Sequence, residues 1–279
     1  MKQKILFMMI DMNVGGTEKA FLNLVSEMDF TKYGVTLLLL EAKGGFLKDV
    51  PKEVQIETLE NYEQIKDEIM LPPLECAKKF WKLKNYSESV GILLHHFIFK
   101  ISKDRTSYYK FLLRKFDKRK KYDVAVAFAG PMDFITTYVL EKVEADKKIQ
   151  WIHFDVSKNG ISVKYAKRNY PKFHKVFVVS DQARQSLIHV IPQIEKKTET
   201  KHNIVSEKMC LHQAENGETY REYKGIKILT VGRLYREKGQ DIIPEVARQL
   251  KREGYDFKWY LIGEGSIRKE IEKKIEEYE

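Results

Sequence analysis

KILFMMIDMNVGGTEKAFLNLVSEM, residues 4–28, decides the fold. After its first residue the run 4–10 is continuously apolar, which is typical of a strand buried on both faces of a parallel sheet. A glycine pair follows it. Residues 17–28 then place Ala20, Phe21 and Leu24 on one side, as in an amphipathic helix. A strand, a glycine turn and a helix in this order predict the first part of a βαβ unit.

The same alternation continues along the chain. Helix-like segments include 181–191 and 240–254, and they separate further apolar runs with the length of buried strands. These runs are VTLLLL (35–40), VAVAFA (124–129), IQWIHF (149–154), KVFVVS (175–180), IKILTV (226–231) and FKWYLI (257–262). Alternating strands and helices predict an α/β fold with doubly wound parallel sheets of the Rossmann type.

A polar stretch at 205–225 shows neither a helical nor a strand period, so we expect a linker or a surface loop there. It separates a predicted domain at 1–204 from the start of a second at 226–279. Because a sheet of two strands cannot bury both faces of a helical layer, the second domain is expected to be incomplete.

The composition, 43% hydrophobic and 12% aromatic, is that of a globular protein. Asp11 ends the first apolar run without a cleavage site after it, and no run reaches about 18 apolar residues, so neither a signal peptide nor a membrane-spanning helix is expected. Cys76 and Cys210 lie far apart without a His or Cys cluster. A disulfide framework and a metal site are therefore not expected, which fits the reducing cytoplasm.

The net charge of +10 comes from residues 76–121, which hold 14 Lys or Arg and three acidic residues, a net +11. With a Trp and several Phe, this segment suits an anionic membrane surface. Helices packed on the sheet with a solvated Lys/Arg face explain it equally well. His95 and His96 are expected on such a helix, without a metal. Nucleic acid is not expected, because no recognised binding motif is present.

The loop after the first strand contains Gly15 and Gly16. A glycine pair lets the backbone approach a ligand, and the N-terminus of the following helix offers unpaired N–H groups to a phosphate. A tight turn with Thr17 as the N-cap is the alternative. The G-x-G-x-x-G pattern is absent, which argues against a nicotinamide-dependent oxidoreductase.

Two later loops carry polar residues. In WIHFD (151–155), His153 and Asp155 are predicted on the same side of a strand, where an imidazole can hydrogen-bond a hydroxyl; a structural histidine is the alternative. In VGRLYREKGQD (231–241), Arg233 and Lys238 are spaced to reach one anion near a helix start, which suits a diphosphate. A solvated basic loop is the alternative, and it suits Arg236.

These segments together resemble family 4 glycosyltransferases: GGTEKAFLNL, WIHFD, KVFVVSDQARQSL before Asn203-Ile204, and TVGRLYREKGQD with LIGEGSIRKEI. The VGRL-x-x-EKG block is the most specific part. The resemblance implies a GT-B fold and retaining transfer, without a metal or other cofactor, from a nucleotide-sugar such as a UDP-sugar. It implies a glycan or lipid-linked acceptor in capsule, surface polysaccharide or cell-wall glycopolymer synthesis.

The resemblance extends to eight individual residues. They are Gly15, Gly16 and Glu18 in the cleft loop, His153 as the catalytic contact with the transferred sugar, Arg233 and Lys238 at the donor diphosphate, and Gly263 and Gly265 near the nucleotide base. A tight turn capped by Ser266 explains the last two glycines equally well.

The sequence departs from this family near its end. The family has an acidic E-x7-E pair further along its second domain, whereas Glu270 and Glu277 stand in the last predicted helix and lie in the wrong element. We therefore expect a chain cut short at Glu279 and inactive alone, with a nucleotide- or membrane-binding fragment as the alternative function. We expect it in the cytoplasm, including the inner face of the cell membrane.

Overall fold

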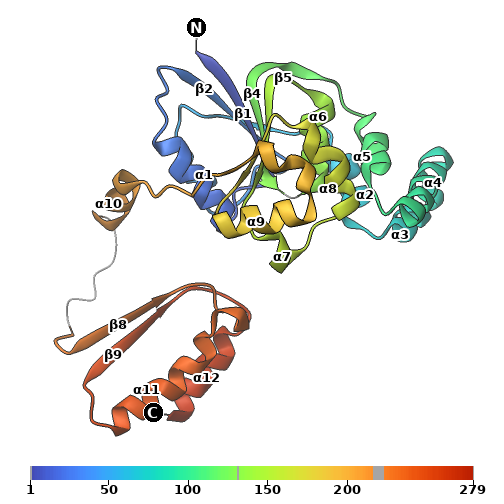
Figure 1. The fold of residues 1–279 in the computed structure, drawn as a ribbon. Helices are drawn as coiled ribbons and strands as arrows, with labels where there is room; N and C mark the ends of the chain where they lie inside the picture. The colour runs from blue at the N-terminus through green and yellow to red at the C-terminus, as the bar shows by residue number, and fades with distance from the viewer. Residues whose placement is uncertain (1, 131, 216–222, 279) are drawn as a thin grey trace. The chain divides into compact units, whose positions relative to one another are not determined.

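The computed structural model describes residues 2–130, 132–215 and 223–278 (Figure 1). The chain divides into two compact units, Met1–His212 and Gln213–Glu279. Within the described ranges, no helix is long and apolar enough to cross a membrane.

The first unit is built on a seven-stranded parallel sheet with the order β3-β2-β1-β4-β5-β6-β7. Strand β1 (Gln3–Met9) lies in its interior, between β2 (Tyr33–Leu39) and β4 (Arg119–Gly130). The other strands are β3 (Gln55–Thr58), β5 (Val143–Ile152), β6 (Lys175–Val178) and β7 (Thr198–Thr200). The strand order reverses between β1 and β4, and doubly wound sheets bind their ligands at the carboxyl ends of strands at such a point.

The apolar runs predict five of these seven strands and miss the two edge strands, β3 and β7. Their sequences, QIET and TET, contain no continuous apolar run. An edge strand pairs on one side only, and three of the four residues of β3 are exposed. The buried-strand pattern therefore finds the centre of the sheet and not its margins.

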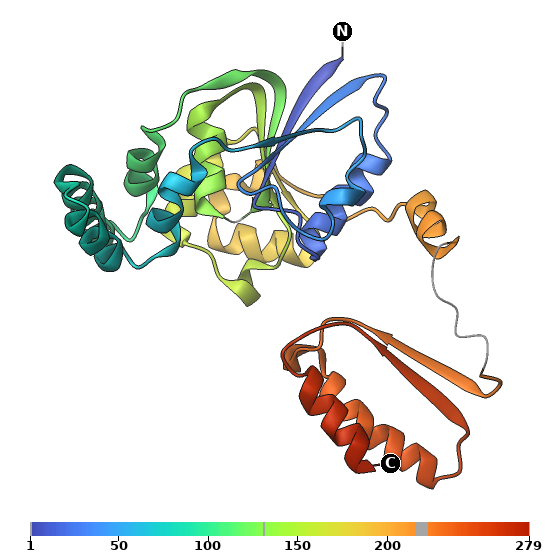
Figure 2. The same ribbon diagram turned by 180° about the vertical axis from the view of Figure 1, so that it is seen from behind.

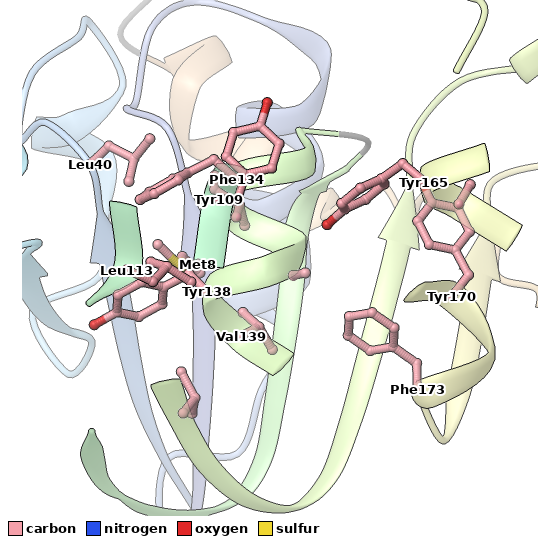
Figure 3. Packing of buried hydrophobic residues seen from close by; sticks show 14 of the residues in the cluster. Met8, Leu40, Tyr109, Leu113, Phe134, Tyr138, Val139, Tyr165, Tyr170 and Phe173 are labelled. Carbon is pink, nitrogen blue, oxygen red and sulfur yellow. The ribbon is translucent and has the colours of Figure 1, made fainter. Parts of the chain in front are cut away.

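The central strands face two separate cores. Leu6 and Met8 contribute to one core, and Phe7 and Met9 to the other, which is why the run 4–10 is continuously apolar. Helix α1 (Gly16–Ser26) covers the second core. The first core, shown in Figure 3, is covered by α2 (Tyr62–Met70), α5 (Thr106–Leu113), α6 (Asp133–Lys142), α8 (Val163–Asn169) and α9 (Asp181–Val190).

Helices α3 (Pro73–Lys82) and α4 (Tyr86–Ser102) form a hairpin between α2 and α5. In both ribbon views it lies at the outer margin of this unit, beside α5 and away from the sheet (Figures 1 and 2). The remaining short elements of the unit are η1 (Leu47–Asp49), α7 (Val156–Asn159), η2 (Tyr170–Lys172) and η3 (Pro192–Lys197).

The stretch 205–225 was predicted as a linker or a surface loop, but α10 (Glu207–Glu215) forms in it; residues 216–222 lie outside the described residues. The buried Ser206 donates its hydroxyl proton to Glu27 Oε1 at 2.6 Å, and its own oxygen accepts the backbone N–H of Met209 at 3.3 Å. The Met209 side chain packs against the core beneath α1. The local bond to Met209 caps the start of the helix, and the bond to Glu27, which is distant in the sequence, holds that start against α1.

The second unit has a two-stranded parallel sheet, β8 (Ile226–Val231) and β9 (Phe257–Ile262), as predicted. It also contains α11 (Ile243–Arg252) and α12 (Arg268–Tyr278), with short turns η4 (Arg236–Lys238) and η5 (Gln240–Ile242) between β8 and α11. Its buried core is formed by Leu234, Ile267 and Ile271. The α/β class predicted from the sequence is confirmed in both units.

Candidate functional site

The loop between β1 and α1 begins at the point where the strand order reverses. The buried Asp11 accepts hydrogen bonds from the backbone N–H of Asn13 at 3.0 Å and from its side-chain Nδ2 at 2.7 Å. The loop after β2 supports this turn, since Met12 N donates to Lys43 O at 2.8 Å and Phe46 N donates to Met12 O at 2.9 Å. The start of the loop is therefore held on both sides.

Gly15 and Gly16 lie where that loop becomes α1. Gly15, and not Thr17, is the N-cap, so the alternative with a Thr17 cap is wrong. Gly15 has no side chain with which to cap the helix, and nothing lies within 4 Å of the position that a Cβ on Gly16 would take. An uncapped helix start with open space beside it can accept an anion on its N–H groups.

The Glu18 carboxylate lies over this helix start. Its Oε2 occupies the space that a Cβ on Gly15 would need. Burial raises the pKa of Glu18, the negative charge of Asp11 adds to the shift, and a hydrogen bond from its own backbone opposes it. A carboxylate at a helix N-terminus interacts with the same N–H groups and dipole as a bound anion would. Glu18 and an anionic ligand would therefore compete for this position.

His153 follows β5 and lies among aromatic rings. Its ring centroid is 4.3 Å from that of Phe128 and 5.7 Å from that of Trp151, to which it is nearly parallel at 9°. Burial lowers the pKa of His153 to about 4, and a backbone contact of Phe128 only partly opposes this shift, so the imidazole is neutral at pH 7. Both ring nitrogens are buried without a well-formed hydrogen bond among the described residues. Such nitrogens are suited to a ligand hydroxyl.

Asp155 does not share a strand face with His153, and that prediction was wrong. Strand β5 ends at Ile152, and Asp155 is the N-cap of α7. Its Oδ1 accepts hydrogen bonds from the backbone N–H of Ser157 at 2.9 Å and from the Ser157 hydroxyl at 2.8 Å. These bonds lower the pKa of Asp155. Strand β5 ends two residues before the end of the apolar run 149–154, because Asp155 already begins α7 as its N-cap.

Phe128 on β4 connects α1 with His153. Its ring is 5.8 Å from that of Phe21 on α1, and it also packs edge-on against Trp151 at 5.0 Å. A cavity of about 270 Å³ opens beside these rings, and it is lined by Phe128, Trp151, the α1 residues Ala20 and Leu24, and residues 200–204. Neither Phe128 nor Trp151 was predicted as a site residue, because one aromatic residue in an apolar run is typical of a core.

Asp133 is a titratable group that the sequence analysis missed. It begins α6, directly after the strand that lies between β1 and β5. Its backbone oxygen accepts hydrogen bonds from the hydroxyls of Tyr165 at 2.7 Å and Thr137 at 2.8 Å. Burial raises the pKa of the Asp133 carboxyl to about 7, which Arg105 opposes. An acidic residue in a first helical turn is common and gave no signal.

In the second unit, Arg233 and Lys238 lie on the loop between β8 and α11, as predicted. The exposed Arg233 guanidinium pairs with Glu237 at 2.8 Å and lies 5.2 Å from the ring centroid of Tyr235. Lys238 is exposed at the end of η4, and it forms no ion pair within the described part of the chain. An exposed ion pair contributes little free energy, so Arg233 can exchange Glu237 for an anionic ligand.

Gly263 and Gly265 lie between β9 and α12, and close approach of two loops explains them. A Cβ on Gly263 would collide with the backbone oxygen of Gly232, and one on Gly265 with the backbone of Leu234. Gly263 also has a φ of +154°. Leu234 N donates to Glu264 O at 2.9 Å and joins the loops. Both glycines therefore hold the β9–α12 loop against the one that carries Arg233, and their role near a nucleotide stays a prediction.

Two more side chains fix the shape of the Arg233 loop. The buried Gln240 donates from Nε2 to Gly232 O at 3.0 Å. Arg236 is exposed, as expected of a solvated loop residue, and it pairs with Glu270 on α12 at 2.7 Å. In the ranges that the structure describes, no three His, Cys, Asp or Glu side chains form a cluster suited to a metal ion.

The second unit matches a known protein family. Residues 214–279, which include Arg233 and Lys238, match the family described as "Glycosyl transferases group 1". This match covers the second unit and not the first. No curated protein matches the chain.

Solved glycosyltransferase structures share the fold over 99% of this chain. A TarM mutant of S. aureus, in complex with Fondaparinux, alpha-GlcNAc-glycerol and UDP, has a TM-score of 0.57 at 14% identity, and the chain covers 75% of it. Anabaena HepE in complex with UDP and glucose has a TM-score of 0.57 at 14% identity, with 66% covered. A glycosyltransferase from Rickettsia africae ESF-5 has a TM-score of 0.53 at 16% identity, with 64% covered.

At these identities the similarity shows the fold alone, and that fold is the one of GT-B glycosyltransferases. The chain spans between 64% and 75% of the length of the three neighbours. The chain therefore has a fold like that of these glycosyltransferases.

Proposed function

We propose that this chain belongs to a retaining, family 4 glycosyltransferase that moves a sugar from a nucleotide-sugar to an acceptor hydroxyl. The observation that carries the proposal is the basic loop between β8 and α11, which lies within the residues that match the glycosyl transferases group 1 family. TarM and HepE, whose structures contain UDP, support a uridine diphosphate sugar as the donor.

Arg233 and Lys238 would bind the diphosphate of the donor. A planar guanidinium can bind two phosphate oxygens together, and an ammonium adds a second positive charge. As the glycosidic bond breaks, negative charge grows on the leaving diphosphate, and a preorganised cation pair stabilises that charge more in the transition state than in the ground state. Gly263 and Gly265 would keep the neighbouring loop close enough to border the nucleotide.

His153 would contact the transferred sugar. Its imidazole is neutral, buried and without a well-formed hydrogen bond among the described residues, so a sugar hydroxyl could pair with either ring nitrogen. At Gly15 and Gly16, the N–H groups at the start of α1 would bind the ligand. The ligand would displace the Glu18 carboxylate from this helix start. The protein then acts mainly by positioning the substrates and stabilising charge.

The acceptor would be a glycan or a lipid-linked glycan in surface polysaccharide, capsule or cell-wall glycopolymer synthesis. The neighbours that support this class are TarM, whose complex includes alpha-GlcNAc-glycerol, and HepE, whose complex includes glucose. No metal or other cofactor takes part in the proposed reaction.

Calorimetric titration of the full chain with UDP and UDP-sugars tests the donor site. Arg233→Ala should raise the Kd for UDP at least tenfold, because a charge-assisted hydrogen bond contributes about 1.5–3 kcal/mol. Glu237→Gln should lower the Kd, since it removes the carboxylate that competes for Arg233. Arg252→Ala, an exposed arginine at the end of α11, is the matched control and should leave the Kd unchanged. Equal UDP affinity in wild type and Arg233→Ala would overturn the proposed role of Arg233.

A transfer assay separates an enzyme from a binding module. The full chain is incubated with a panel of UDP-sugars and glycan acceptors, and released UDP and glycosylated product are measured. Product formation supports the transferase, and the anomeric configuration of the product decides whether transfer is retaining. Tight UDP binding without product on any acceptor would favour the alternative, a nucleotide-binding module.

A further inference from the structure

The α3–α4 hairpin, residues 73–102, attaches to the rest of the first unit through one side only. Cys76 and Ile92 are buried against the core. Ser89 on α4 donates its hydroxyl to Ala77 O on α3 at 2.8 Å and joins the two helices. Glu88 on α4 pairs with Lys115, which follows α5, at 2.9 Å. These contacts hold the hairpin firmly and direct one side of α4 to the core.

The opposite side of α4 is apolar and exposed. A surface helix normally presents polar residues there, and an apolar outer side indicates that something else covers it. Phe97 is 61% exposed and Ile101 68% exposed. The exposed apolar residues recur every three or four positions, and we call them the apolar stripe: Tyr86, Val90, Leu93, Leu94, Phe97 and Ile101.

The turn of the hairpin extends this stripe. Trp81 at the end of α3 is 57% exposed, and its ring packs edge-on against Tyr86 at a centroid distance of 4.8 Å. Leu83, in the turn itself, is also exposed. An exposed Trp beside an aliphatic stripe is typical of elements that lie at a lipid–water boundary.

Eleven of the 14 basic residues of segment 76–121 divide into two groups. Six form ion pairs: Lys79, Lys110, Arg114, Lys115, Lys118 and Lys121. Five have no carboxylate partner among the described residues, and all five lie on or at the ends of the hairpin: Lys78, Lys82, Lys84, Lys100 and Lys103. The outer side of the hairpin therefore combines exposed lysines with the apolar stripe.

We propose that the α3–α4 hairpin docks on an anionic lipid surface, with the apolar stripe among the acyl chains and the five lysines at the headgroups. Between residues 73 and 103 the acidic residues are Glu75 and the ion-paired Glu88, so the charge complements anionic lipid. A second copy would bring like charges together. At about 1.5 Å per residue, α4 is about 26 Å long, and its core-facing side keeps it in the plane of the surface. This proposal does not depend on the proposed transferase activity.

Vesicle sedimentation of the full chain tests the docking, without nucleotide or acceptor present. Vesicles of phosphatidylcholine with 30% phosphatidylglycerol should bind at least tenfold more protein than vesicles of phosphatidylcholine alone. Phe97→Gln with Ile101→Gln should lower the partition coefficient at least tenfold, and Lys82→Gln with Lys84→Gln about tenfold. The matched control, Lys48→Gln with Lys52→Gln, changes two exposed lysines elsewhere on the first unit and should bind like the wild type.

The fluorescence of Trp81 is a second measurement, and it reports whether the hairpin itself lies in the lipid. Brominated acyl chains in the anionic vesicles should quench part of the tryptophan fluorescence, and Trp81→Phe should abolish the quenching because Trp151 and Trp259 are not on the hairpin. Circular dichroism checks that each variant is folded. Equal binding to both vesicle types, binding that survives both hairpin variants, or quenching that persists in Trp81→Phe would overturn the proposal. So would a dimer that the hairpin variants dissociate while vesicle binding is absent.

Discussion

His153→Phe should remove a pH dependence from the folding stability of the first unit. In the folded chain, burial lowers the pKa of His153 to about 4 from its ordinary value of 6.5, while in the unfolded chain the imidazole titrates near the ordinary value. Between these two pH values the unfolded chain binds a proton that the folded chain does not. Falling pH therefore destabilises the folded state, and the contribution of His153 is fully favourable above about pH 6.5.

The two pKa values set the magnitude. Between pH 7.5 and pH 5 the wild type should lose about 2 kcal/mol of unfolding free energy through this one group, and about 3.4 kcal/mol by pH values well below 4. Phenylalanine retains an aromatic ring against Phe128 and Trp151, which contact His153 at centroid distances of 4.3 Å and 5.7 Å. All other titrating groups are common to both proteins, so the difference between them isolates His153.

Urea unfolding at pH 7.5 and pH 5, followed by tryptophan fluorescence, measures this difference. Trp151 stacks on His153 and reports on the unit in which it lies. His189→Gln, which changes an exposed histidine on α9, is the control and should follow the wild type at both pH values. A stability gap between wild type and His153→Phe that stays constant within about 0.5 kcal/mol from pH 7.5 to pH 5 would refute the buried, neutral imidazole.

Two further predictions concern packing in the first unit. Gly44→Ala should lower the unfolding free energy by about 1–3 kcal/mol, because Gly44 has a φ of +114° and a Cβ there meets the Met12 backbone. Gly16→Ala has open space at its Cβ and should change the unfolding free energy by less than about 0.5 kcal/mol. Equal thermal shifts for the two variants would contradict this prediction. Lys115→Met should cost about 1–3 kcal/mol in urea unfolding at pH 7.5, because it removes the charged hydrogen bonds that Lys115 donates to Glu68 and Glu88. The cost stays moderate because burial raises the pKa of Glu68 to about 7, so this carboxyl can take up a proton when Lys115 is absent. Similar losses in Lys118→Met, whose side chain is 70% exposed, would disprove the assignment.

The elements that can be read from the sequence are those with a strong local period. The runs 4–10, 35–40 and 124–129 are continuously apolar because both faces of the strands they form are covered, and each was predicted within a few residues. Strand β3, with the sequence QIET, is exposed at three of its four positions and has no such pattern. Helix α10 depends on contacts of Ser206 and Met209 with distant residues, which no local window contains.

The residues of the candidate site also fall into those that a local sequence pattern predicts and those that it does not. Gly15, Gly16, Arg233 and Lys238 were predicted in loops that follow strands, because each loop comes directly after an apolar run in the sequence. Asp155 was misplaced, because an apolar run does not show where a helix cap ends a strand. Asp133 was missed, since the burial that raises the pKa of its carboxyl comes from the surrounding fold.

By itself, then, the sequence determined the α/β class, which loops follow the apolar strands, and the basic character of segment 76–121. These properties follow from local period, from glycine spacing and from a count of charges. Only the tertiary structure decided which of those charges are paired, that the outer side of α4 is apolar, and that His153 is neutral. Ion pairing, exposure and pKa depend on which distant residues come together, and they are properties of the folded chain.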